Sequence, residues 1–331
     1  MDFLSLTSDE LTEQMLILSQ KPFRAHQLDQ WLHYKKVLDF DLMTDISKSF
    51  REVLKEKFQI EKLKISKILT SKTSNTKKIL FELSDGYKIE TVIMEYDAGL
   101  SVCISTQVGC KMGCSFCASG KNGFVRNLSA QEILLQYYQA EEEVGREIAN
   151  IVLMGIGEPL DNYDNVIRFF DVLKGKFSLR NLTLSTSGIV PKMYDLAEKK
   201  LGLTLSVSLH AAFQKKREEI MPVAKKYNLT ELIDACQNYI NKTGRRLTFE
   251  YAVIENFNDK PEDAKELIKI TDGLNCLINL IPVNDNNMGY SVSGSTVNRF
   301  KELLLGKGHC VTIRRTLGTD INSACGQLAY K

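Results

Sequence analysis

The chain has 331 residues, of which 44% are hydrophobic and 25% are charged, and its formal net charge at pH 7 is +2. These values are ordinary for a globular protein with a sizeable core, and the near-neutral charge neither requires nor forbids a nucleic-acid partner. The sequence has no run of 18 apolar residues, so it predicts no membrane-spanning helix. Its acidic start lacks the basic region of a signal peptide, and eight cysteines in a chain of this size do not suggest a disulfide framework, so we expect a cytoplasmic protein.

Residues 1–60 are predicted to form a small helical domain. Ser8 precedes two acidic residues, as at a helix start, and Pro22 occupies a first-turn position before apolar residues at helical spacing.

Residues 61–98 have a different pattern, because their apolar residues alternate with a period of two and turn residues separate the alternating stretches. The stretches are 63–69, 79–83 and 87–94. They predict a short antiparallel β extension.

From residue 99 to residue 331, strand patterns alternate with helical patterns. Strands are expected over 101–106, 151–154, 182–185, 203–208, 247–253, 276–281 and 310–314. Helices are expected over 130–144, 166–173, 192–199, 229–240, 261–270 and 297–305. Repeated strand–helix units imply a parallel sheet, and six units predict an α/β fold, a partial (β/α)6 TIM-like barrel.

Polar or glycine-containing clusters follow most of these strands. The first strand runs into Gln107–Cys110, the second into Gly155–Pro159 and the fourth into Ser208–His210. In barrels of this type the site lies at the carboxyl ends of the strands. The sequence therefore predicts a single site there, with a cysteine-containing loop at its mouth.

Cys110, Cys114 and Cys117 are the cysteines of that loop. A structural zinc site needs four ligands, so zinc stays open only if His210 or Cys103 supplies the fourth. A [4Fe–4S] cluster has four irons, and three cysteines leave one iron able to bind a small molecule. The spacing favours such a cluster over zinc.

The triplet, with Phe116 before its third cysteine, resembles the CxxxCxxC signature of radical S-adenosylmethionine (SAM) enzymes. Residues 79–330 as a whole resemble the RlmN/Cfr family of these enzymes, which methylate adenine in 23S ribosomal RNA. The motifs that carry the resemblance are Glu90–Val92, Cys103–Cys110, Met154–Leu160, Ser185–Ile189, Ser208–His210, Thr243–Arg246, Leu280–Asn284 and Ala324–Leu328. More weakly, Pro22–Gln27 resembles the RNA-contacting N-terminal domain of the family.

The resemblance implies two cofactors. One is a [4Fe–4S] cluster held by Cys110, Cys114 and Cys117, and the other is SAM at the open iron, with two SAM molecules used per turnover. The implied SAM contacts are Gly157, Glu158, Ser185, Ser208, Leu209, His210 and Asn284. Taken alone, a Gly-Glu pair would predict a turn with a surface acid.

The resemblance also assigns roles to residues outside the triplet. Cys325 accepts a methyl group from SAM and becomes an S-methylcysteine. Cys103 removes a proton and then forms a transient disulfide with Cys325, and Glu90 is a proton acceptor. From the residues alone, the small neighbours of Cys325 predict an accessible loop, whereas Cys103 would be expected as a buried strand cysteine.

The implied reaction is methylation at C2 of an adenine near the peptidyl-transferase centre of 23S rRNA, with the adenine beside the tRNA anticodon as a second target. The C2 and C8 carbons of adenine are electron-poor and do not attack a methyl sulfonium, so a carbon radical is needed, and the base must leave its stack. Methylation at C8 by the Cfr branch, which confers antibiotic resistance, stays open, although Pro159, Val108 and Arg245–Arg246 look more like the C2 branch.

Two wider alternatives stay open as well. One is a radical SAM enzyme with another substrate, and the other is a non-enzymatic RNA-binding protein stabilised by a metal. The partners implied by the resemblance are 23S rRNA, tRNA and an electron donor such as flavodoxin or ferredoxin, without a membrane. The chain is expected to be a monomer.

Two groups of residues receive no role in the site. Cys236, Cys276 and Cys310 lie in apolar patterns and are expected in the core. Basic pairs are each expected on a solvated surface unless the fold gathers them on one face. They are Lys35–Lys36, Lys77–Lys78, Lys215–Arg217, Lys225–Lys226, Arg245–Arg246 and Arg314–Arg315.

Overall fold

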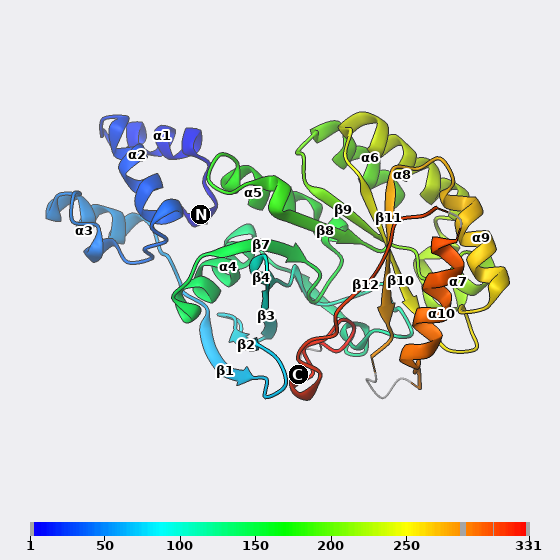
Figure 1. Ribbon diagram of the computed structural model, residues 1–331. Coiled ribbons are helices and arrows are strands. Elements are labelled where there is room, and N and C mark those ends of the chain that lie inside the picture. Colours follow the sequence, from blue (N-terminus) through cyan, green and yellow to red (C-terminus); the bar gives the residue numbers. More distant parts are fainter. Residues whose placement is uncertain (1–2, 285–288, 307, 329–331) are drawn as a thin grey trace.

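The structure is a computed structural model that describes residues 3–284, 289–306 and 308–328. Its main sheet has ten strands in the order β1-β2-β3-β4-β7-β8-β9-β10-β11-β12 (Figure 1). The bounds are β1 Lys64–Thr70, β2 Thr76–Glu82, β3 Lys88–Tyr96, β4 Gly99–Cys103, β7 Ile148–Leu153, β8 Leu182–Thr186, β9 Thr204–Ser208, β10 Leu247–Val253, β11 Cys276–Pro282 and β12 Val311–Ile313. A separate two-stranded sheet pairs β5, Gln107–Gly109, with β6, Phe124–Asn127.

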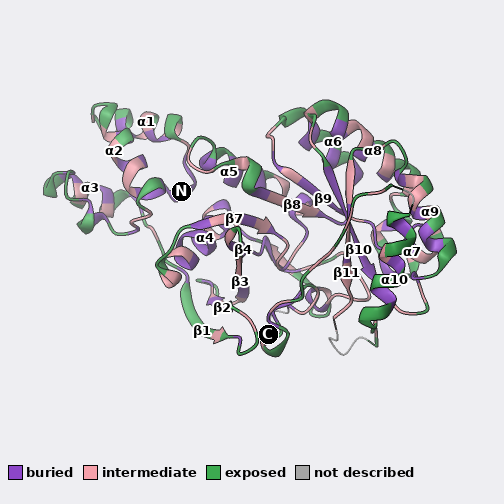
Figure 2. Cartoon of the chain, in the orientation of Figure 1, coloured by how far each residue is buried: buried purple, intermediate pink, exposed green. Residues whose placement is uncertain are grey.

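The strands from β4 onwards are parallel neighbours, which confirms the α/β fold and the partial TIM-like barrel. Helices connect them: α4 Ala130–Val144, α5 Tyr163–Leu173, α6 Val190–Lys199, α7 Gln214–Ile220, α8 Leu229–Thr243, α9 Pro261–Thr271 and α10 Gly294–Leu305. Every residue of β10 is buried, because the strand is central in the parallel run and covered on both faces. Figure 2 shows the central strands of the parallel run mainly buried and the helices exposed on their outer sides.

The antiparallel extension forms, but it is not a sheet of its own. β3 pairs with β2 on one side and with β4, the first parallel strand, on the other. The extension therefore continues the barrel sheet and gives it an antiparallel edge. Its outermost strand, β1, is largely exposed on both faces.

The N-terminal helices lie at one end of the barrel, over α4 and α5 (Figure 1). They are α1 Ser8–Ile17, α2 Phe23–Asp29 with a π-helical continuation over Gln30–Tyr34, and α3 Lys48–Lys57. Besides apolar packing, buried polar pairs hold them: His33 Nδ1 lies 2.8 Å from the hydroxyl of Tyr138, and Lys176 lies 2.8 Å from Asp29. The division of the chain at residue 60 stays a prediction.

Several expectations need correction. The hairpin of β5 and β6 and the short helix α7 were not predicted, because each is too short to show a clear period. Of the three cysteines placed in the core, Cys236 is buried, Cys276 is half-buried and Cys310 is exposed. Cys310 directly precedes β12, whose residues are only partly buried.

The basic pairs are not all on solvated surfaces. Lys78 is 6% exposed and Arg217 is fully buried, whereas the other basic residues of their clusters, Lys77, Lys215 and Lys216, are less enclosed. Each reaches a polar partner inside the fold, which is what permits a charge to be buried. None of the described helices combines the length and apolar character needed to span a membrane.

Candidate functional site

Two adjoining cavities of about 170 and 130 Å³ open at the carboxyl ends of the parallel strands. Ten of the residues predicted for the site line the first cavity: Cys110, Cys114, Cys117, Gly157, Glu158, Ser185, Ser208, His210, Asn284 and Cys325. Cys103 lines the second cavity. The wall between the cavities is formed by residues that line both, and they include Cys117, Met154, Asn284, Arg314 and Cys325.

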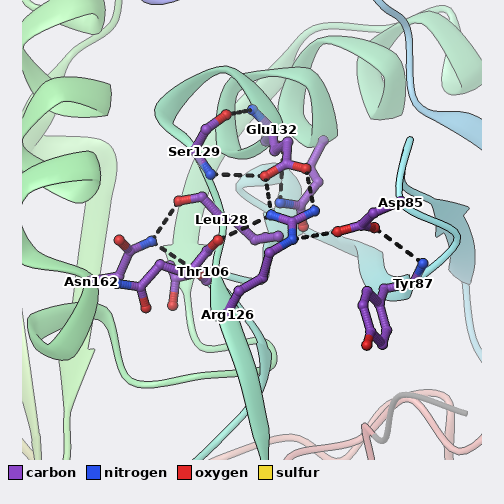
Figure 3. A network of polar contacts seen from close by, with 10 residues as sticks. Asp85, Tyr87, Thr106, Arg126, Leu128, Ser129, Glu132 and Asn162 are labelled. Carbon is purple, nitrogen blue, oxygen red and sulfur yellow. Dashed lines mark hydrogen bonds and ion pairs between the residues drawn. The ribbon is translucent and has the colours of Figure 1, made fainter.

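The cysteine loop is closed at its base by the β5–β6 hairpin. The backbone amide of Leu128 donates to the carbonyl of Thr106. The side-chain amide of Asn162 donates to the carbonyls of Thr106 and Leu128, each at 2.8 Å (Figure 3). Because Asn162 is 1% exposed, these bonds are shielded from water and fix the two ends of the loop.

A charged network holds the same hairpin from outside. Arg126 on β6 binds Glu132 with both terminal nitrogens at 2.8 Å, and its Nε donates to Asp85 in the β2–β3 turn (Figure 3). Glu132 also caps α4 together with Ser129. The hydrogen bond from Arg126 lowers the pKa of Asp85. The network therefore ties together the antiparallel extension, the cysteine hairpin and the start of α4.

The three thiols face the first cavity and are not bridged. Burial raises the pKa of Cys110 to about 12 and also raises the pKa of Cys114 and of Cys117. Buried thiols of this kind keep their protons unless a cation offsets the charge of the thiolate, so the donor set fits a positively charged metal group.

The spacing of the thiols bears on which group fits. Within 3–284, 289–306 and 308–328, no three His, Cys, Asp or Glu side chains meet closely enough to hold one metal ion. A [4Fe–4S] cluster does not need such convergence, because each thiolate binds a different iron. The three thiols around one cavity therefore fit a cluster, whereas a closed zinc site would need four ligands around one ion.

Glu158 is not a surface acid, contrary to what its sequence neighbourhood alone suggests, for it is 3% exposed. Its carboxylate accepts from the backbone amides of Ser187 at 2.6 Å and Leu160 at 3.0 Å. Burial raises the pKa of this carboxyl, and these hydrogen bonds oppose the rise. The arrangement leaves an oriented acceptor on the cavity wall.

Gly157 has a structural reason to be glycine. Its φ is +107°, and a Cβ there would lie 2.6 Å from the Cβ of Gln107. Gln107 in turn accepts from the amide of Glu158 at 2.9 Å and donates to Asp161. Close backbone approach at Gly157 thus links the Glu158 turn to the cysteine hairpin.

His210 ends the turn after β9 with a φ of +55°. Its Nδ1 accepts from the amide of Ala252 at 2.9 Å, so Nε2 carries the proton of the neutral ring. Burial, and then the charge of Arg217, lowers the pKa of His210 to about 3. Its ring meets Phe116 edge to face at 4.8 Å, which places the cysteine loop against the end of β9.

The other predicted SAM contacts differ in placement. Ser185 on β8 and Ser208 on β9 line the cavity, and Asn284 lies just past β11, where its side chain donates to the carbonyl of Cys325 at 3.0 Å. Leu209 is fully buried in the main core and is not among the lining residues. Its contact with SAM stays a prediction.

The two thiols outside the triplet have opposite surroundings. Cys103, the last residue of β4, is buried, and burial followed by the charge of Cys325 raises its pKa to about 12. Cys325 is exposed, as its small neighbours predicted. Nevertheless both thiols line the second cavity.

Glu90 lies on β3, on the face that it shares with Val92, the residue opposite Cys103. Its carboxylate lies 2.8 Å from the ammonium of Lys78, and both side chains are 8% exposed. Lys78 also donates to the carbonyl of Asn322 at 2.9 Å. Glu90 lines neither cavity, and its role as a proton acceptor stays a prediction.

Three charged residues near the site were not singled out from the sequence. Glu250 and Arg314 line the first cavity, and Arg217 donates to the carbonyl of Ser187 at 2.7 Å and to that of Ser208 at 3.2 Å. Glu250 could have been found, because it is a charge in the middle of a strand that reads as buried on both faces. Arg217 and Arg314 gave no such signal, since each belongs to a basic cluster that resembles a surface.

Two family models match this chain. The model for the "Ribosomal RNA large subunit methyltransferase N-terminal domain" matches residues 1–60, and the model for the "Radical SAM superfamily" matches residues 104–268.

Similar proteins cover the chain from end to end. A "Probable dual-specificity RNA methyltransferase RlmN" from Clostridium novyi is 50% identical over 99% of this chain and 97% of its own length. One of the same description from Alkaliphilus oremlandii is 48% identical over 100% of this chain and 98% of its own. The crystal structure of a radical SAM methyltransferase from Sphaerobacter thermophilus superposes with a TM-score of 0.94, at 38% identity and 98% coverage of both chains.

Proposed function

This chain belongs to the RlmN family of radical SAM RNA methyltransferases, and from that premise we propose that it methylates C2 of an adenine near the peptidyl-transferase centre of 23S rRNA. The dual specificity in the names of its relatives supports tRNA, at the adenine beside the anticodon, as a second substrate. The observation that carries the proposal is the position of Cys325, whose thiol belongs to the wall between the cavity of the cysteine triplet and the cavity of Cys103.

Cys110, Cys114 and Cys117 would hold a [4Fe–4S] cluster, which together with SAM supplies the 5′-deoxyadenosyl radical. Their positions around one cavity, and the need of buried thiols for a cation, support this ligand set. Two SAM molecules would be used per turnover, one as methyl donor and one as radical source.

The residues around the cavity would bind SAM in a fixed orientation. Glu158 offers a buried carboxylate to an amine or hydroxyl donor, and His210 offers its Nε2 proton to an acceptor. Ser185, Ser208 and Asn284 would add polar contacts from the neighbouring strand ends, and Gly157 lets the backbone come close. Leu209 would contribute through its backbone alone.

Cys325 and Cys103 would act in turn on the RNA base. Cys325 accepts the methyl group and becomes an S-methylcysteine. Methylation removes the charge of Cys325, one of the causes that raise the pKa of Cys103, so Cys103 then loses its proton more readily. Cys103 would take the proton from the methylated base, with Glu90 as a further acceptor. As its thiolate, Cys103 would then attack Cys325 Sγ, so that the disulfide forms while the bond from that sulfur to the transferred carbon breaks. The electron pair of the broken bond stays on that carbon, which takes up a proton and leaves with the product.

Other features of the proposal concern the setting of the reaction. RNA as substrate and eight unbridged cysteines support a cytoplasmic location, where thiols stay reduced. We further propose that the enzyme acts as a monomer and receives electrons from flavodoxin or ferredoxin.

The position of the added methyl group tests the proposal. The reconstituted enzyme is incubated anaerobically with SAM, a reductant and a 23S rRNA fragment, and the digested RNA is analysed by mass spectrometry against both methyladenosine standards. We expect 2-methyladenosine, and none with the Cys325→Ala variant. A product carrying only 8-methyladenosine would replace the C2 assignment with the C8 alternative. Consumption of SAM without any methylated adenosine in the RNA would contradict RNA methylation.

A further inference from the structure

Arg314 places a guanidinium directly beside the sulfur of Cys325. The residue follows β12, and its backbone amide continues the parallel pairing by donating to the carbonyl of Leu280 at 2.8 Å. From this anchored position Nη1 lies 3.0 Å from Cys325 Sγ, and Nη2 lies 3.3 Å from Met154 Sδ. Its side chain is 24% exposed, so water screens the charge only in part.

The guanidinium of Arg314 also has a carboxylate, that of Glu250, as a neighbour, but its shorter contact is with the sulfur of Cys325. Glu250 Oε1 lies 3.5 Å from Arg314 Nη2, a longer contact than the one between Nη1 and the sulfur. The carboxylate also accepts from the hydroxyl of Ser206 at 3.2 Å and from the amide of Asn279 at 2.9 Å. Glu250 is thus held in the strand by two neutral donors, and Arg314 is left directed at the thiol.

The other titratable groups around Cys325 do not provide a second cation at the sulfur. They are the thiols of Cys103 and Cys117 and the phenol of Tyr96, each of which interacts electrostatically with Cys325. Arg315 lines the second cavity only, whereas Arg314 lines both. Among the cavity-lining residues that the structure describes, Arg314 is therefore the cation whose hydrogen bond reaches the thiol.

We propose that Arg314 is a catalytic residue that stabilises the thiolate of Cys325 and aims it into the first cavity for methyl transfer, and that Glu250 receives the guanidinium once the sulfur is methylated. The proposal rests on the proposed function, in which Cys325 is the methyl acceptor. Hydrogen bonds from a cation to an anion are the strong ones, so this contact matters more for a thiolate than for a thiol.

The step is balanced in atoms and charge. The thiol proton leaves to solvent, to which Cys325 is exposed. A bond then forms between Cys325 Sγ and the methyl carbon, and the bond from that carbon to the sulfonium breaks, with its electron pair staying on the sulfur of SAM. The negative thiolate and the positive sulfonium become two neutral thioethers, so the attraction of Arg314 for the sulfur falls and Glu250 becomes its better partner.

The first test needs neither cofactor. In the full chain without cluster or SAM, the rate at which iodoacetamide alkylates Cys325 is measured by mass spectrometry of its peptide over a range of pH, since only the thiolate reacts. We expect Arg314→Gln to be alkylated more slowly than the wild type, by about tenfold near pH 7, because its thiolate lacks the cationic donor. Arg246→Gln removes an equal charge from an exposed position just before β10, at the end of the strand away from the cavities, and is expected to leave the profile unchanged.

A second variant guards against a trivial loss of folding. Arg314→Lys keeps the charge without the two-pronged geometry of the guanidinium. We expect its alkylation profile to lie between those of the wild type and Arg314→Gln. An unshifted Arg314→Gln profile, or equal shifts in the variants at 314 and 246, would overturn the proposal.

Methyl transfer separates this proposal from the proposed function. With methyl-labelled SAM, we expect Arg314→Gln to label Cys325 at least about tenfold more slowly near pH 7 and to approach the wild type at high pH. If the wild type takes no label, the proposed function fails and with it the role of Arg314 in methyl transfer, while the alkylation profiles still decide whether Arg314 stabilises the thiolate. If the wild type is labelled and Arg314→Gln is labelled equally fast at every pH, the role of Arg314 fails alone.

Discussion

The two sides of the first cavity, which the cysteine triplet lines, are held in different ways. One side consists of turns that follow β7, β8 and β9, each anchored by a buried parallel strand and by bonds to backbone amides, such as those that Glu158 accepts. The other side is the segment 314–328, whose one regular element is the short turn Thr319–Ile321. Side chains hold this segment: Asp320 accepts from the hydroxyl of Ser71 and the amide of Lys72, and Lys78 donates to the carbonyl of Asn322.

The difference matches what each side would do in the proposed reaction. A cofactor must stay in one place through the reaction, and a wall made of backbone gives it fixed donors and acceptors. Cys325 must face a methyl donor, then a base and then Cys103, so a thiol on a side-chain-held segment suits it better. This comparison also suggests what the antiparallel extension does: β2 and the β1–β2 loop supply the residues that hold the segment 314–328.

The largest effect on stability is expected at Lys78, a buried charged residue that holds the segment 314–328. Lys78→Met leaves Glu90 without its cation in a site where both side chains are 8% exposed. We expect the free energy of unfolding to fall by about 3 to 5 kcal/mol, measured by urea denaturation. The double variant Lys78→Met/Glu90→Leu should recover most of the loss, and a double variant as unstable as the single one would show that the pair is not the cause.

On the backbone-built side, Gly157→Ala tests the close approach to Gln107. The added methyl meets the Cβ of Gln107 at 2.6 Å in a backbone of positive φ, so we expect a loss of about 2 to 3 kcal/mol in stability. Gly202→Ala is the control, since Gly202 has a φ of +76° with nothing within 4 Å of the added Cβ. Equal losses in the two variants would contradict the contact as the cause.

The N-terminal helices offer a third comparison, because a buried histidine helps to hold them. Burial, and then the charge of Lys176, lowers the pKa of His33 to about 3 from 6.5. The unfolded chain therefore binds the proton first as pH falls from 6.5 towards 3, and stability is lost over that window, by about 2 kcal/mol at pH 5. His33→Gln should reduce the difference in unfolding free energy between pH 7 and pH 5 by this amount, and the exposed His26→Gln should not.

The smallest effect on stability, with a clear effect on function, is expected at Asp320. Asp320→Ala removes the acceptors for Ser71 and Lys72, so amide hydrogen exchange over 318–326 should quicken while the cooperative unfolding transition stays in place. Because the thiol is then less well positioned, labelling of Cys325 by SAM should slow by about tenfold. Asp272→Ala, at the end of α9, is the control. Unchanged amide exchange over 318–326 in Asp320→Ala would contradict the claim that Asp320 holds this segment in place.

The contrast between the two sides also explains what could be predicted from the sequence. The parallel strands and their polar ends followed from periodicity and from the rule that barrel sites lie at carboxyl ends of strands, so the cysteine loop, Glu158 and His210 were expected at one mouth. The burial of Glu158 was not, because Gly-Glu-Pro has the pattern of an exposed turn. The contacts of Lys78 and Asp320 join residues more than 240 positions apart and leave no periodic trace.

The central claim is that Cys325 carries the methyl group on its way from SAM to the RNA. The direct measurement is anaerobic reconstitution of the full chain with iron and sulfide, incubation with methyl-labelled SAM, and peptide mapping of the label. The account predicts a brown protein with the label on the peptide that contains Cys325, and no label there in Cys325→Ala. A protein that carries the cluster, binds SAM and never takes label at Cys325 would contradict it.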